Sequence, residues 1–191
     1  LVVMAVFFVI RGVQGQGAEY IPLALTLGLA VGNGAIGFVD DYCKVVKKQN
    51  EGLTWKQKLV LQLALAAAYV AVMAYTGNLS TSVNLPFTDR TLNLGWGVYP
   101  LSVIILAGVT NGGNITDGVD GLASGVTFVI GGFFAVWAFH MQNEQVGAVG
   151  AILIGATLGF LVYNFHPAKV FMGDTGSLFL GSLVIGTAFM M

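Results

Sequence analysis

Long apolar stretches separated by short polar segments make up most of this chain. A membrane-spanning helix needs about 20 mostly apolar residues. Five internal stretches fit that requirement, although the third is short: residues 20–39, 59–76, 96–110, 122–139 and 146–163. Residues 1–10 and 177–191 look like partial spans. The pattern predicts an all-α integral membrane protein, a polytopic bundle of transmembrane helices.

Composition supports the membrane assignment. The chain is 56% hydrophobic and only 9% charged, whereas soluble domains carry about 25% charged residues. A net charge of −1 gives no general attraction to nucleic acid, so we expect the lipid bilayer, and no nucleic acid, as a partner. Because apolar runs reach both ends, we interpret residues 1–191 as a single transmembrane domain that is truncated at both ends.

Counting the spans places the polar segments on alternate sides of the membrane. Residues 40–58, 111–121 and 164–176 fall on one side, together with six lysines, Lys44, Lys47, Lys48, Lys56, Lys58 and Lys169. The opposite side holds Arg11 and Arg90. Basic residues concentrate on the cytoplasmic side, so the lysine-rich side is predicted to be cytoplasmic. Residues 78–93, which are polar and partly alternating, predict a short external β-hairpin.

Each of the three cytoplasmic segments contains aspartate, and the first carries an adjacent pair. Asp40 and Asp41 follow the end of a predicted span. Neighbouring residues do not share a helix face, so we expect one to point into the bundle and the other toward the loop. Acids at a helix C-terminus oppose the helix dipole, which predicts a compensating cation, either a metal or Lys44 and Lys48. The alternatives are solvated end charges and lysines that only set topology.

The second segment contains Asp117 and Asp120, spaced three residues apart. If this spacing is helical, both carboxylates lie on one face at the start of a span, where the dipole favours anions. Two helix-start acids with no other role remain the alternative. The nearby amides of Asn111 and Asn114, among several glycines, suit close approach to a polar ligand.

The third segment contains Asp174, between Gly173 and Thr175. It is either the cap of the last span or part of a phosphate site at a helix N-terminus. Several acids and amides, without a cysteine or histidine cluster, fit Mg²⁺ better than zinc. The three segments together predict phosphoryl transfer at the cytoplasmic membrane surface.

Three stretches of the chain, residues 37–48, 114–123 and 167–177, carry a family resemblance. They resemble motifs of the polyprenyl-phosphate N-acetylhexosamine-1-phosphate transferases, in the same order and on one membrane side. The resemblance implies a ten-helix bundle, often a homodimer, with a cytoplasmic cleft in a bacterial plasma membrane; this chain would be a fragment covering about helices two to eight.

Within that family, Thr116-Asp117 and residues 173–177 favour the branch that uses UDP-N-acetylmuramoyl-pentapeptide. The implied reaction transfers phospho-N-acetylmuramoyl-pentapeptide to undecaprenyl phosphate with Mg²⁺, giving lipid I and UMP for peptidoglycan synthesis. A sister branch transfers N-acetylglucosamine phosphate from UDP-N-acetylglucosamine. An ion-coupled transporter is a third hypothesis, but transporters place such residues near the midplane and often show inverted repeats, whereas these acids lie at predicted helix ends.

The resemblance also implies roles for individual residues. Asp174 would be the magnesium ligand, and Asp40, beside Asp41, would deprotonate or orient the lipid phosphate, by direct attack or through a covalent intermediate. The sugar-diphosphate region would be lined by Lys44, Lys48, Asn111, Asn114 and Asp117. Uracil and the rest of the cleft would involve Asp120, Asn164 and Phe171. The family's histidine-rich loop and Pro-Thr-Met-Gly-Gly motif are missing, which we attribute to truncation.

Overall fold

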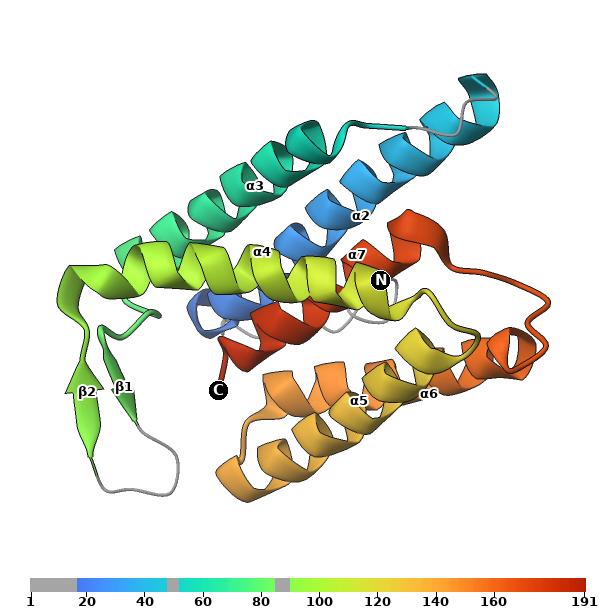
Figure 1. The fold of residues 1–191 in the computed structure, drawn as a ribbon. Coiled ribbons are helices and arrows are strands. Elements are labelled where there is room, and N and C mark those ends of the chain that lie inside the picture. The colour runs from blue at the N-terminus through green and yellow to red at the C-terminus, as the bar shows by residue number, and fades with distance from the viewer. Residues whose placement is uncertain (1–16, 48–51, 85–89) are drawn as a thin grey trace.

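The computed structural model describes residues 17–47, 52–84 and 90–191, and its architecture is mainly helical (Figure 1). The predicted partial span at residues 1–10 and Lys48 lie outside the described residues. Ten elements follow one another along the described parts: η1 (Gly17–Tyr20), α2 (Ile21–Lys47), α3 (Trp55–Tyr75), β1 (Ser82–Asn84), β2 (Thr91–Asn93), η2 (Gly95–Gly97), α4 (Val98–Thr116), α5 (Leu122–Met141), α6 (Glu144–Asn164) and α7 (Gly173–Ala188).

The five predicted internal spans are confirmed as helices long and apolar enough to cross a membrane: α2, α3, η2 with α4, α5 and α6. Two of their boundaries were predicted too early. Helix α2 continues to Lys47 and α4 to Thr116, because no proline interrupts either polar extension. Consequently Asp40 and Asp41, and also Asn111 and Asn114, lie within helices and not in loops.

The predicted hairpin is also present. Strands β1 and β2 pair antiparallel, with Ser82 opposite Asn93 and Val83 opposite Leu92. Figure 1 shows the hairpin at one end of the bundle, at the left, whereas the loop between α6 and α7 lies at the right. The hairpin and the acidic segments therefore occupy opposite ends, as the alternation of spans predicted.

Two hydrophobic cores hold the helices together, and both include α2 and α7. One core packs Tyr20, Leu23 and Ala30 with side chains of α5, α6 and α7. The other packs Leu29 with side chains of α3, α4 and α7. Helix α7 is therefore central, since it lies against α2 and α4 and also contacts α5.

Glycine allows α7 to approach its neighbours closely at the acidic end. A Cβ atom at Gly37 would lie 2.3 Å from the Asp174 carbonyl oxygen, and one at Gly113 would lie 2.9 Å from Gly181 Cα. Small residues at such positions are typical of helix–helix contact in membranes. The contact at Gly37 sets the start of α7 directly against the Asp40 and Asp41 turn of α2.

Candidate active site at the acidic end of the bundle

Asp40 is buried near the C-terminal end of α2. Its side chain is only 1% exposed in relative terms. Oδ1 accepts a hydrogen bond from the Leu53 backbone N–H at 2.7 Å, and Oδ2 lies 2.6 Å from Lys44 Nζ, one helical turn away. A buried carboxylate requires paired charge and hydrogen bonds, and the structure provides both. The prediction that one of the two acids points into the bundle is confirmed for Asp40.

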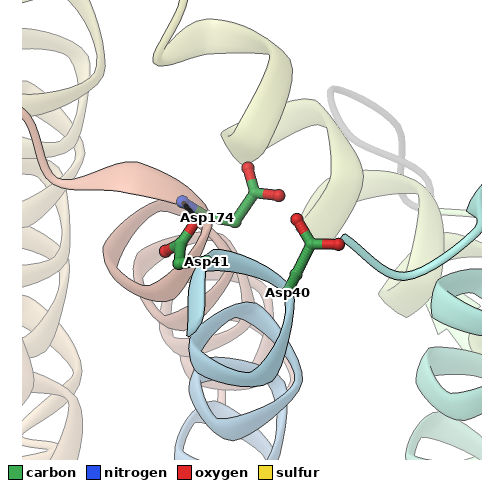
Figure 2. A group of neighbouring side chains, drawn as sticks. All are labelled: Asp40, Asp41 and Asp174. Carbon is green, nitrogen blue, oxygen red and sulfur yellow. Dashed lines mark hydrogen bonds between the residues drawn. The ribbon is translucent and has the colours of Figure 1, made fainter. Parts of the chain in front are cut away.

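Asp174 brings a second carboxylate to the same place from the first turn of α7. Figure 2 shows the carboxylates of Asp40 and Asp174 facing each other across the gap between α2 and α7. Asp174 Oδ2 accepts from Lys58 Nζ at 2.5 Å and from Lys44 Nζ at 3.2 Å. Its other oxygen accepts from Asn114 Nδ2 at 2.7 Å. Four helices, α2, α3, α4 and α7, therefore contribute to this site.

Asp41 has a different partner from its neighbour. Its Oδ2 accepts from the Thr175 backbone N–H at 2.9 Å and from Thr175 Oγ1 at 2.7 Å, while Oδ1 accepts from the Asp174 N–H at 3.4 Å. Asp41 thus satisfies the free N–H groups at the start of α7, where the helix dipole favours an anion. The expectation that the second acid points toward the loop was wrong, because Asp41 faces the first turn of α7. Of the two alternatives left open for Asp174, the structure does not show the cap of the last span, since Met172 occupies the cap position and makes no side-chain capping bond.

Lys58 is a residue of the candidate site that the sequence prediction did not include. The sequence placed it only among the six lysines of the predicted cytoplasmic side, yet its Nζ lies between Asp174 and Asp40, 3.6 Å from Asp40 Oδ2. A capping box at Thr54 and Gln57 begins α3 directly before it. That Thr-x-x-Gln pattern was the available signal, since it predicts a helix start that places Lys58 in the first turn at the acidic end.

An open cleft adjoins this cluster. Its volume is about 770 Å³, and its walls include Asp40, Lys44, Lys58 and Asn111. Asp40 and Asp174 pair with the ammonium groups of Lys44 and Lys58. Asp41 adds a third carboxylate next to them, so the three acids outnumber the two lysines. A cleft of this size, with anions and cations at its wall, can receive a polar ligand that carries phosphate and a cation.

Asp117 and Asp120 do not form the helical pair that their spacing predicted. Asp117 caps the C-terminus of α4, and Asp120 lies in the turn before α5. Burial, with repulsion from the Asp174 carboxylate, raises the pKa of Asp117 to about 6. The Asp117 carboxylate is therefore close enough to the acidic cluster for the charge of Asp174 to affect its pKa. It is not one of the three carboxylates, Asp40, Asp41 and Asp174, that form the cluster.

The raised pKa of Asp117 predicts how stability depends on pH. The folded chain binds this proton more tightly than the unfolded chain, so stability is lost as pH rises from about 4 to about 6. Asp117→Asn removes that loss, and in EDTA we expect its advantage in Tm over the parent to grow between about pH 4 and 6 and then to level off. Thermal unfolding in detergent measures this, and Mg²⁺ should reduce the advantage. A variant that is less stable at every pH would contradict it.

Asp120 instead clamps the loop between α6 and α7. Its Oδ2 accepts from the Ala168 backbone N–H and meets His166 Nδ1, both at 3.0 Å. The Ala168 hydrogen bond, with help from His166, holds the pKa of Asp120 below its ordinary value. His166 is therefore a side-chain partner of Asp120 within this loop region.

Asn164 and Phe171 lie along the same loop. Asn164 is 2% exposed, and its amide accepts from the Gly121 N–H and Ser124 Oγ and donates to the Val170 carbonyl oxygen. Its amide is thus directed into the protein, not into an open cleft. Phe171, which follows Val170, is 69% exposed. Asn164 therefore supports the loop that presents Phe171.

Comparison with known proteins identifies the chain's relatives. Residues 2–191 match the model of the family described as glycosyl transferase family 4. The chain belongs to glycosyl transferase family 4. A Phospho-N-acetylmuramoyl-pentapeptide-transferase of Bacillus subtilis (strain 168) is 46% identical over 166 residues, which cover 87% of this chain and 51% of that protein.

Two further relatives carry the same name. The protein of Halalkalibacterium halodurans is 46% identical over 166 residues, 87% of this chain and 51% of the relative. The protein of Bacillus cytotoxicus is 45% identical over 175 residues, 92% of this chain and 53% of the relative. This glycosyl transferase family 4 chain thus spans about half the length of the curated relatives it matches.

The donor set of this family 4 chain fits a hard divalent cation. One ligand oxygen from each of Asp40, Asp41 and Asp174 lies within 4.8 Å of the others (Figure 2). Carboxylate oxygens are the ligands that Mg²⁺ prefers. The Asp41 carboxylate already accepts hydrogen bonds from the start of α7. Asp174 and Asp40 are therefore the acids best placed to hold a cation.

Proposed function

We propose that the protein containing this chain transfers phospho-N-acetylmuramoyl-pentapeptide from UDP-N-acetylmuramoyl-pentapeptide to undecaprenyl phosphate, giving lipid I and UMP. The observation that carries the proposal is identity of about 46% to relatives of that name across 87% of this chain. The geometry supports it, because acids, lysines and amides from four helices meet beside an open cleft. In phosphoryl transfer, a protein acts mainly by positioning groups and offsetting charge.

We further propose that Asp174, with Asp40, holds Mg²⁺. The ion, when bound, would polarise the diphosphate and offset its charge. In this arrangement Lys44 and Lys58 would no longer be the main countercharges of the acids, and their ammonium groups would bind phosphate oxygens of the two substrates. Asn114, which donates to Asp174 and to Ser177 Oγ, would hold the Asp174 carboxylate in its orientation.

Asp40 would act on the lipid phosphate. Its Oδ1 is held by the Leu53 N–H and its Oδ2 lies on the side of Lys44, and a carboxylate fixed in this way can accept a proton from the phosphate or fix its orientation. Direct attack by the phosphate and a covalent intermediate both remain open. The hydrogen bonds of Asp41 to the start of α7 favour a role in positioning Asp174. They argue against a direct contact between Asp41 and the substrate.

We place the cleft on the cytoplasmic face of a bacterial plasma membrane. The support is the distribution of charge, since the lysines gather at the acidic end while the hairpin end carries few basic residues. The lipid substrate would reach the cleft from the bilayer, and the sugar nucleotide from the cytoplasm. Homodimer formation stays a prediction from the family resemblance.

UMP release tests the proposed reaction. The intact protein in detergent, given undecaprenyl phosphate and Mg²⁺, is expected to release UMP with UDP-N-acetylmuramoyl-pentapeptide and to stop in EDTA. UDP-N-acetylglucosamine, offered separately, serves as the control for the sister activity. UMP release with UDP-N-acetylglucosamine alone would change the assigned substrate but keep the reaction type. No UMP release with either sugar nucleotide would refute the proposal.

Phe171 offers a test of how the nucleotide is bound. We propose that its exposed ring stacks on uracil, a contact worth about 1–3 kcal/mol per base in proteins that bind nucleotides this way. Phe171→Ala is therefore expected to raise KM for the UDP-sugar by roughly tenfold and leave KM for undecaprenyl phosphate nearly unchanged. Phe165→Ala is the matched control, because Phe165 is an equally exposed ring at the start of the same loop. Equal losses for both substrates would count against stacking.

A further inference from the structure

Gln62 is buried in α3 with half of its amide unsatisfied. Its side chain is 1% exposed, and its Oε1 accepts a hydrogen bond from Asn111 Nδ2 at 2.7 Å. Within the described residues its Nε2 has no hydrogen-bond partner. A buried donor without a partner lowers stability, so packing alone does not account for glutamine at this position.

The orientation of both amides follows from a backbone carbonyl. Asn111 Nδ2 also donates to the Ala107 carbonyl oxygen at 2.8 Å. Because a carbonyl oxygen can only accept, the amide nitrogen of Asn111 must face Ala107. Gln62 must then present its oxygen to that nitrogen, which leaves its own nitrogen unpaired.

This arrangement leaves one atom of Asn111 free for a ligand. Both hydrogen bonds of the side chain use Nδ2, and Asn111 lines the cleft beside Asp40, Lys44 and Lys58. Among the described residues, no group donates to Asn111 Oδ1. In a cleft wall with two lysines, this oxygen is a neutral acceptor suited to a hydroxyl or N–H group of a substrate.

We infer that Gln62 is a positioning residue that holds the Asn111 carbonyl oxygen toward the sugar nucleotide. The inference rests on the proposed function, since it assigns the cleft to a UDP-sugar. Gln62 does not touch the substrate itself. It acts by anchoring the amide nitrogen of Asn111, and its unsatisfied nitrogen is the cost to stability of that anchoring.

The test is a double-mutant cycle of Gln62→Leu and Asn111→Ala in the intact protein. Gln62→Leu is expected to lower kcat/KM for the UDP-sugar about tenfold, in line with the loss of a supporting hydrogen bond behind a ligand-binding group. KM for undecaprenyl phosphate should not change. In the Asn111→Ala background, Gln62→Leu should have no further effect.

Thermal stability separates positioning from simple packing. Gln62→Leu removes an unsatisfied donor, so its Tm should equal or exceed that of the parent although activity falls. Gln145→Leu is the matched control at the opposite end of the bundle, since Gln145 also has a buried, unsatisfied amide atom; it should leave kcat/KM unchanged. Additive effects in the cycle, an activity loss that follows a fall in Tm, or no loss at all would each overturn the inference.

Binding measurements keep this result distinct from the fate of the proposed reaction. Calorimetric titration with UDP-N-acetylmuramoyl-pentapeptide measures its binding to each of the four proteins of the cycle. These affinities report the coupling between Gln62 and Asn111 without turnover. Coupled binding with no UMP release would preserve the role of Gln62 and refute the reaction. UMP release without coupling would do the reverse.

Discussion

Asp174→Asn is expected to lower UMP release by at least about 1000-fold, roughly 4 kcal/mol of transition-state stabilisation. The change keeps the size and shape of the side chain but removes the charge that would hold the cation. Asp174 is also the carboxylate on which Lys44, Lys58 and Asn114 converge, so substrate phosphates would meet a rearranged cluster. The loss is measured by following turnover as a function of Mg²⁺ concentration. High Mg²⁺ should not restore turnover.

The fold should survive this substitution. Asparagine leaves two carboxylates, Asp40 and Asp41, beside two ammonium groups, so the cluster becomes closer to neutral. We therefore expect Tm in detergent and EDTA to stay near that of the parent. Glu19→Gln, at the opposite end of the chain's described bundle, is the matched control for loss of one acid and should keep full turnover. Substantial activity in Asp174→Asn would refute the metal role.

Gly37→Ala is expected to disturb stability and activity together. The added methyl group would lie 2.3 Å from the Asp174 carbonyl oxygen and 2.7 Å from the Thr175 backbone nitrogen. Neither backbone atom can turn aside as a flexible side chain can, so α2 and α7 must separate. Overpacking of this kind costs about 1–3 kcal/mol, and the movement would also weaken the Asp41 contacts that place Asp174. We expect a lower Tm and a turnover reduced by at least tenfold, or about 1.4 kcal/mol.

Gly28→Ala is the matched control for Gly37→Ala. Gly28 lies in the same helix, but a Cβ atom there would meet nothing within 4 Å. Both variants replace glycine within a helix, which by itself favours alanine. Gly28→Ala should therefore match or exceed the parent in Tm and keep its turnover. If the two variants behave alike, close contact between α2 and α7 is not what holds the site together.

The spans and the grouping of the acids were predictable because both follow from coarse patterns. A run of about 20 apolar residues implies a crossing, and each crossing changes the side of the membrane. The true ends of α2 and α4 were not predictable in this way, because a helix can continue into polar sequence after the apolar run stops. That is why Asp41 and Asn114 were expected in loops and lie in helices.

The contacts within the site depended on tertiary structure. Nothing near Lys58 in the sequence shows that its ammonium group reaches Asp174, 116 positions away. The same holds for Gln62 and Asn111, which are 49 positions apart. The pairing of Asp41 with the start of α7 depends on Gly37, since only close approach of these helices brings the carboxylate to the Thr175 N–H.

The central position of α7 has a consequence for how the protein is made. Asp41 and Thr175 are 134 positions apart, so α2 leaves the ribosome and enters the membrane long before α7 is synthesised. During that interval Asp40 has Lys44, one turn away, as a countercharge, but Asp41 lacks the N–H groups that later bind it. The arrival of α7 supplies those groups and Asp174 in one event. Assembly of the acidic cluster and completion of the α2, α4 and α7 packing are therefore the same late step of biogenesis.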